Sequence, residues 1–67
     1  MNNIYNIGKL IQIKENNLYN IKSKIYFILN QNNINWYEIN ELSNKSLVIL
    51  NEIDKLRNER IEIIKSN

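Results

Sequence analysis

The chain has 67 residues, of which nine are basic and seven are acidic, so its formal net charge is only +2. It contains no cysteine and no histidine, which excludes a disulfide framework and thiolate chemistry and argues against a structural zinc site. A domain of this length buries little apolar surface, so we expect its stability to come from packing, including packing against a second copy or a partner.

Asparagine and isoleucine dominate the composition, with 15 and 14 residues, a bias that is typical of proteins from AT-rich genomes. The basic residues are spread along the chain and no run of like charge forms a nucleic-acid arm, so we do not expect nucleic acid as a partner. The longest apolar stretches, residues 25–29 and 47–50, are far shorter than the roughly 20 residues that span a bilayer. With no secretory signal at the amino terminus either, a cytoplasmic protein is expected.

The first predicted element is a helix over about residues 3–30, which Asn2 or Asn3 can cap. Apolar residues recur in it at alternating steps of three and four, the heptad spacing that forms one seam along a helix. The positions of this first ladder are Ile4, Ile7, Ile11, Lys14, Leu18, Ile21, Ile25 and Ile28. Gly8 is the only glycine and costs about 1 kcal/mol relative to alanine in a helix. A close approach of another backbone at Gly8 is the alternative interpretation.

A polar turn over about residues 31–35 follows, where asparagine tolerates the left-handed conformation that ends many helices. Asn35 and Glu38 have the spacing of a capping box, in which the amide oxygen accepts from a free N–H and the carboxylate reaches back. They predict a second helix over about residues 36–65. Its ladder consists of Ile39, Leu42, Ser46, Ile49, Ile53, Leu56, Arg60 and Ile63.

Each position of the first ladder has a counterpart in the second, and the two residue numbers sum to 67. This arithmetic is that of two antiparallel helices folded near Asn33, with each seam covering the other. The sequence therefore predicts an all-α fold, a coiled-coil-like antiparallel two-helix hairpin that occupies residues 1–67 as a single domain.

Three polar residues interrupt the ladders, and each has two interpretations. A polar residue in a seam can fix register and oligomeric state. For Lys14, which would face Ile53, and for Arg60, the favoured alternative is that the methylenes cover the seam and the charge reaches solvent. Ser46 is predicted to be a tolerated gap whose hydroxyl bonds to the carbonyl four residues back.

Further apolar residues lie outside the seam, and the hairpin alone cannot cover them. We therefore predict a protein interface that includes Tyr19, Tyr26, Trp36, Leu47, Leu50, Ile61 and Ile64. The simplest cover is a second hairpin, which would give a homodimeric four-helix bundle. The alternative is a different protein, because exposed apolar patches mark interaction sites. The two can coexist.

The chemistry-bearing residues are sparse. There is no glycine-rich phosphate loop, and the carboxylates fall on helix surfaces where solvated charge is the ordinary explanation. We expect no catalytic residues, no cofactor and no metal, and hence not an enzyme.

The second half of the chain carries two family resemblances. Residues 42–56 and Arg60 have leucines at intervals that resemble the hairpin segment of flagellar export chaperones for hook-associated proteins, and the match covers residues 33–64. It implies a chaperone-like protein. Residues 39–43 are similar to the approach to the signature of small two-helix aspartyl-phosphate phosphatases of the sporulation phosphorelay. Lys45 and Leu47 replace the acidic residues of that signature, which implies a relative that binds without catalysis.

A third hypothesis rests on no motif. Very small, all-helical proteins from AT-rich sources are common among phage and mobile-element products that block a host enzyme, including anti-CRISPR inhibitors. All three hypotheses share one expectation: the chain covers a surface on a larger partner protein whose identity the sequence does not give.

Overall fold

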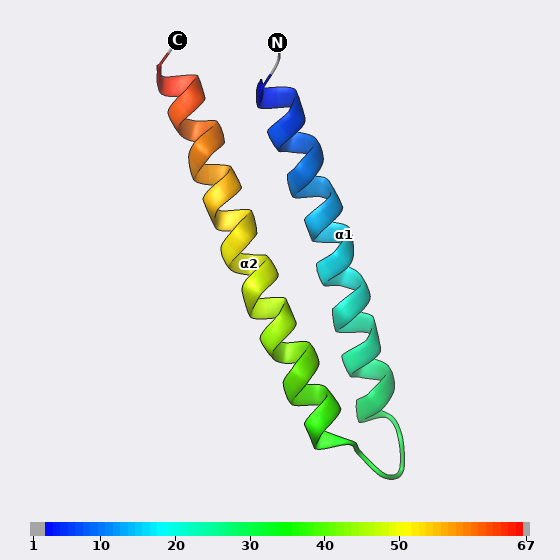
Figure 1. Ribbon diagram of the computed structural model, residues 1–67. Helices are drawn as coiled ribbons and strands as arrows, with labels where there is room; N and C mark the ends of the chain where they lie inside the picture. The colour runs from blue at the N-terminus through cyan, green and yellow to red at the C-terminus, as the bar shows by residue number, and fades with distance from the viewer. Residues whose placement is uncertain (1–2, 67) are drawn as a thin grey trace.

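The computed structural model describes residues 3–66 and consists of helix α1 (Asn3–Leu29), helix α2 (Trp36–Lys65) and the loop between them. The helices run antiparallel and side by side, with the start of α1 and the end of α2 at one end of a rod that measures 54 × 14 × 13 Å (Figure 1). The predicted all-α antiparallel hairpin is confirmed. Helix α1 begins at Asn3 and ends one residue earlier than expected, while Asn2, the other predicted cap, lies outside the described residues.

The core follows the two ladders. Every ladder position is buried or half-buried in the structure. Six side chains are buried most deeply: Ile7, Ile11, Leu18, Ile28, Leu42 and Ile53. Among the described residues, only four positions outside the ladders are even half-buried, namely Gly8, Ile34, Ser43 and Glu52. The heptad spacing therefore locates the hydrophobic core, because side chains repeating every 3.5 residues meet along a single line.

The core weakens at Ser46. Toward the termini a continuous cluster forms around Ile53, which is only 2% exposed. Beside the seam near Ser46 lies a hollow of about 360 Å³ that Ile21 and Ile49 help to line. Ser46 itself is half-buried and is not among the residues that line this hollow. Its hydroxyl donates to the carbonyl oxygen of Ser43, 2.7 Å away and three residues back instead of the predicted four. Both carbonyls lie within reach of a hydroxyl on a helix, and the nearer turn supplies the acceptor here.

Helix α1 ends without the left-handed residue that its asparagines suggested, since no described residue has a positive φ. Instead the helix tightens. The Asn30 N–H donates to the carbonyls of Tyr26 and Phe27, at 3.2 and 3.3 Å, and the Gln31 N–H donates to that of Ile28 at 3.1 Å. The Gln31 side-chain amide also donates to the Phe27 carbonyl at 3.3 Å. These bonds satisfy the carbonyls of Tyr26, Phe27 and Ile28 without a left-handed cap.

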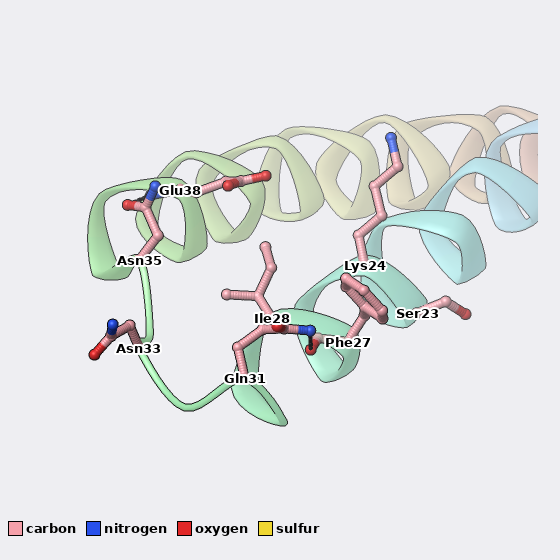
Figure 2. A pocket seen from close by; sticks show the side chains of 8 residues that line it. All are labelled: Ser23, Lys24, Phe27, Ile28, Gln31, Asn33, Asn35 and Glu38. Carbon is pink, nitrogen blue, oxygen red and sulfur yellow. Dashed lines mark hydrogen bonds between the residues drawn. The ribbon is translucent and has the colours of Figure 1, made fainter.

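Helix α2 begins at the predicted cap. The Asn35 side-chain oxygen accepts from the Glu38 N–H at 3.1 Å. The Glu38 carboxylate, however, points along α2 and away from Asn35 (Figure 2), so the return half of the predicted capping box is not made. Ile34 and Ile39 flank the cap at the spacing of a hydrophobic staple, and both are half-buried.

Within residues 3–66, two ion pairs join the helices. Lys14 Nζ lies 3.1 Å from Glu52 Oε2, so its charge is paired across the hairpin and not sent to solvent as predicted. Glu52 directly precedes Ile53, the residue that Lys14 was expected to face, and its carboxylate is therefore within reach of the lysine. The second pair, Arg57 Nη2 with Glu15 Oε2 at 2.8 Å, was not predicted from the sequence.

Candidate protein-binding face

The two ion pairs mark the two edges of the seam. When each helix is written in heptads a to g with the seam at a and d, Glu15 and Arg57 both occupy e positions. Their contact shows that the e positions of the two helices line the same edge. Glu52 occupies a g position, so its pair with Lys14 lies at the opposite edge. Since b adjoins e and c adjoins g around a helix, the hairpin has one e/b face and one c/g face.

The e/b face is rich in apolar side chains. Nine of the fourteen exposed large apolar residues found in residues 3–66 lie on it. We call this surface the apolar face, and it consists of Tyr5, Tyr19, Tyr26, Leu29, Trp36, Leu47, Leu50, Ile61 and Ile64. All seven residues predicted to form a protein interface belong to it and are exposed; for example, Trp36 is 62% and Leu50 is 42% exposed. The structure adds Tyr5, whose ring stacks under Lys9 with Nζ 5.5 Å from the ring centroid, and Leu29.

The apolar face divides into three groups along the rod when residue n of α1 is placed level with residue 67 − n of α2, the pairing of the two ladders, with which the Lys14–Glu52 contact agrees to within one residue. The terminal group is Tyr5, Ile61 and Ile64; the middle group is Tyr19, Leu47 and Leu50; the turn group is Tyr26, Leu29 and Trp36. Charged residues separate them. Glu15, Asp54 and Arg57 lie between the terminal and middle groups, and Lys22 lies between the middle and turn groups.

The c/g face has the opposite character. Its charged residues, which we call the charged face, are Lys24, Glu38, Glu41, Lys45, Glu52, Lys55, Glu59 and Glu62. Only four exposed large apolar residues interrupt them, namely Leu10, Ile13, Phe27 and Val48. The hairpin as a whole is therefore amphipathic. The side with the apolar face is suited to burial, and the side with the charged face is suited to contact with water.

The charged side carries an open hollow of about 600 Å³ at the turn end (Figure 2). Phe27 and Ile28 supply its apolar wall, while Lys24 and Glu38 stand on separate helices at its rim. In Figure 2 the Ser23 hydroxyl points outward, away from the Lys24 ammonium and the Glu38 carboxylate. The polar groups do not converge on one point, so the hollow offers a contact surface and not a catalytic constellation.

Residues 3–66 offer neither a cluster of metal ligands nor a membrane-spanning helix. No group of three carboxylate, histidine or cysteine side chains in this part of the chain could hold a metal ion. Neither α1 nor α2 is long and apolar enough to cross a bilayer. The apolar face is thus the strongest candidate site that the described residues form.

Comparison with known proteins adds no family to this description. No protein family, no curated protein and no solved structure matches the chain. The candidate site rests on the geometry and chemistry of its own residues.

Proposed function

We propose that the protein is a cytoplasmic, non-catalytic regulator that binds a larger partner protein and covers a surface on it. The apolar face makes the contact. The observation that supports the proposal is the gathering of nine large, exposed apolar side chains on one side of a hairpin whose other side carries eight charges.

The energetics favour such a contact. Full burial of a large apolar side chain contributes roughly 1.5–3 kcal/mol, so several residues of the apolar face buried together can offset the cost of association. The anchors stand on two packed helices, and several of them form pairs three residues apart, such as Leu47 with Leu50 and Ile61 with Ile64, a spacing that helices use to contact a hydrophobic groove. A suitable partner presents an apolar groove or helix pair, with polar groups where Glu15, Lys22 and Arg57 would lie.

Three narrower roles fit this contact and differ in the partner. An export chaperone-like protein would bind a secreted subunit, a relative of the phosphorelay phosphatases would bind a response regulator, and a phage or mobile-element inhibitor would bind a host enzyme. The genes beside this one distinguish them: flagellar genes, sporulation genes or a prophage.

The proposal is tested by capture of a partner with matched variants. The Trp36→Ala/Leu50→Ala variant removes two anchors of the apolar face, and Phe27→Ala/Val48→Ala removes an aromatic and an aliphatic residue from the other side. We expect the wild type and the control variant to capture the same protein from an extract of the source cells, and the first variant to lose it. Equal capture by all three would refute the proposal.

A further inference from the structure

We infer that the apolar face is self-complementary, and that two copies of the chain pair through it in an antiparallel register that hides the face from other proteins. The inference rests on the proposed function, because it supplies the regulation of the same face. Dimer formation and partner binding then compete, and the free face appears only as the dimer dissociates.

The size of the face suits a dimer. The rod is 54 Å long and 14 Å wide, so its long side offers about 750 Å², close to the roughly 800 Å² that each partner buries in a stable interface. The isolated hairpin has a thin core, since only six apolar side chains of the described residues are buried. Two hairpins stacked through their apolar faces form a four-helix bundle with a second apolar layer.

The apolar groups fit a two-fold axis that crosses the helices at the level of the middle group. Such an axis stacks α2 on α2 of the second copy and opposes residues whose numbers sum to 97. Leu47 then meets Leu50 of the second copy, and Trp36 meets Ile61 of the second copy. Middle group packs on middle group, and the turn group packs against the terminal group.

The first helix fits the same axis. It stacks α1 on α1 of the second copy with Tyr19 near the axis, and it brings Leu29 to the level of Gly8 of the second copy. A Cβ added at Gly8 would meet nothing within 4 Å, so this position leaves room for a leucine from outside. Gly8, the only glycine of the chain, is then the site at which the second copy approaches α1 closely.

The charges distinguish this register from the parallel one. In the antiparallel dimer, Glu15 and Lys22 of the second copy lie within one helical turn, twice by symmetry, and Asp54 faces Ser43 of the second copy. In a parallel dimer α1 would face α2 of the second copy at the same level. Glu15 would then approach Asp54 of the second copy, and Lys22 would lie against Leu47 with no acid opposite. Like charges facing each other are destabilising, so the antiparallel register is preferred.

The test compares charge variants of the full chain by sedimentation equilibrium. Lys22→Glu replaces two attractive contacts of the dimer with two repulsive ones, and we expect its dissociation constant to rise about tenfold. The triple variant Glu15→Lys/Lys22→Glu/Arg57→Glu exchanges the signs of the three paired residues, restores both the pair within each chain and the pair between chains, and should regain most of the affinity. Because the chain has no cysteine, Tyr19→Cys provides a second readout. A short bismaleimide should link two Cys-bearing chains, and should not link those of Phe27→Cys, on the other side.

Each other outcome overturns a defined part of the inference. The antiparallel register is overturned if Lys22→Glu leaves the dissociation constant of the dimer unchanged and Tyr19→Cys does not crosslink two chains. A chain that is monomeric at all accessible concentrations overturns self-association altogether. Neither result touches the proposed function, which is refuted separately if Trp36→Ala/Leu50→Ala still captures the partner.

Discussion

The seam and the apolar face follow the same heptad spacing, but one is covered within the chain and the other is not. Polar residues interrupt the seam at three of its sixteen positions, whereas only nine of the seventeen e and b positions are large apolar residues. A continuous apolar line can hold two helices together permanently. A line broken by charges is better suited to an association that forms and dissociates, with the charges selecting the register.

The largest expected effect belongs to the seam. Ile53 is 2% exposed and lies in the main core cluster, so Ile53→Ala should destabilise the fold by roughly 2–5 kcal/mol. Because only six apolar residues of the described part of the chain are buried, that loss is enough to unfold a large fraction of the molecules. Circular dichroism of the variant should show greatly reduced helicity. Helicity close to that of the wild type would mean that the seam is not the main source of stability.

The next effect belongs to the apolar face. Leu50→Ala/Ile61→Ala removes one residue of the middle group and one of the terminal group, both exposed in the hairpin, so helicity should be retained once the protein is dilute. Association should weaken by about a hundredfold or more, since each buried side chain contributes roughly 1.5–3 kcal/mol.

Trp36 serves as the probe for that experiment, because it is the only tryptophan, is 62% exposed and remains in the variant. Its emission should shift to the blue as the wild type is concentrated, and stay constant for Leu50→Ala/Ile61→Ala. A matched control is Ile13→Ala/Val48→Ala on the other side, which should behave like the wild type. If the control loses the shift instead, the contact lies on the charged side.

The seam could be predicted from the sequence because its position depends only on the repeat. An α-helix returns to the same side every 3.6 residues, so isoleucine and leucine at steps of three and four define a line whatever the details of packing. The interruption of the second ladder at Ser46 could equally be predicted, because a serine side chain is too small to fill the space between its neighbours Leu42 and Ile49. The seven predicted interface residues lie on one face for the same reason.

Other features depend on competition between alternatives that the sequence leaves nearly equal. Lys14 can reach solvent or Glu52, and the rotamer that pairs the charges is adopted. The end of α1 can be closed by a left-handed asparagine or by a tighter last turn. The Gln31 side-chain amide favours the tighter turn because it donates to the Phe27 carbonyl. Leu29 joins the apolar face because α1 remains helical through that residue.

A smaller, stabilising effect is expected where the seam is interrupted. Ser46→Leu would place a branched apolar side chain beside Ile21 and Ile49, next to a hollow of about 360 Å³. It removes a hydroxyl whose bond to Ser43 is local and satisfied within the helix. We expect a gain of about 0.5–2 kcal/mol in the free energy of unfolding, measured by urea denaturation. Destabilisation would show that Ser46 sits in a tighter space than its half-buried surroundings indicate.

The smallest effect concerns the ion pair within the apolar face. Glu15 and Arg57 are each about half exposed, at 48% and 49%, so solvent screens their 2.8 Å contact. A double-mutant cycle with Glu15→Gln and Arg57→Gln should give a coupling of about 0.2–1 kcal/mol. The cycle is best measured in the Leu50→Ala/Ile61→Ala background, where Lys22 of a second copy no longer contributes. High salt should remove most of the coupling, because the screening length falls to about 3 Å at 1 M ionic strength. A coupling that is larger and independent of salt would mean that this pair helps to hold the hairpin together, and the division between a stabilising seam and a register-setting face would then be wrong.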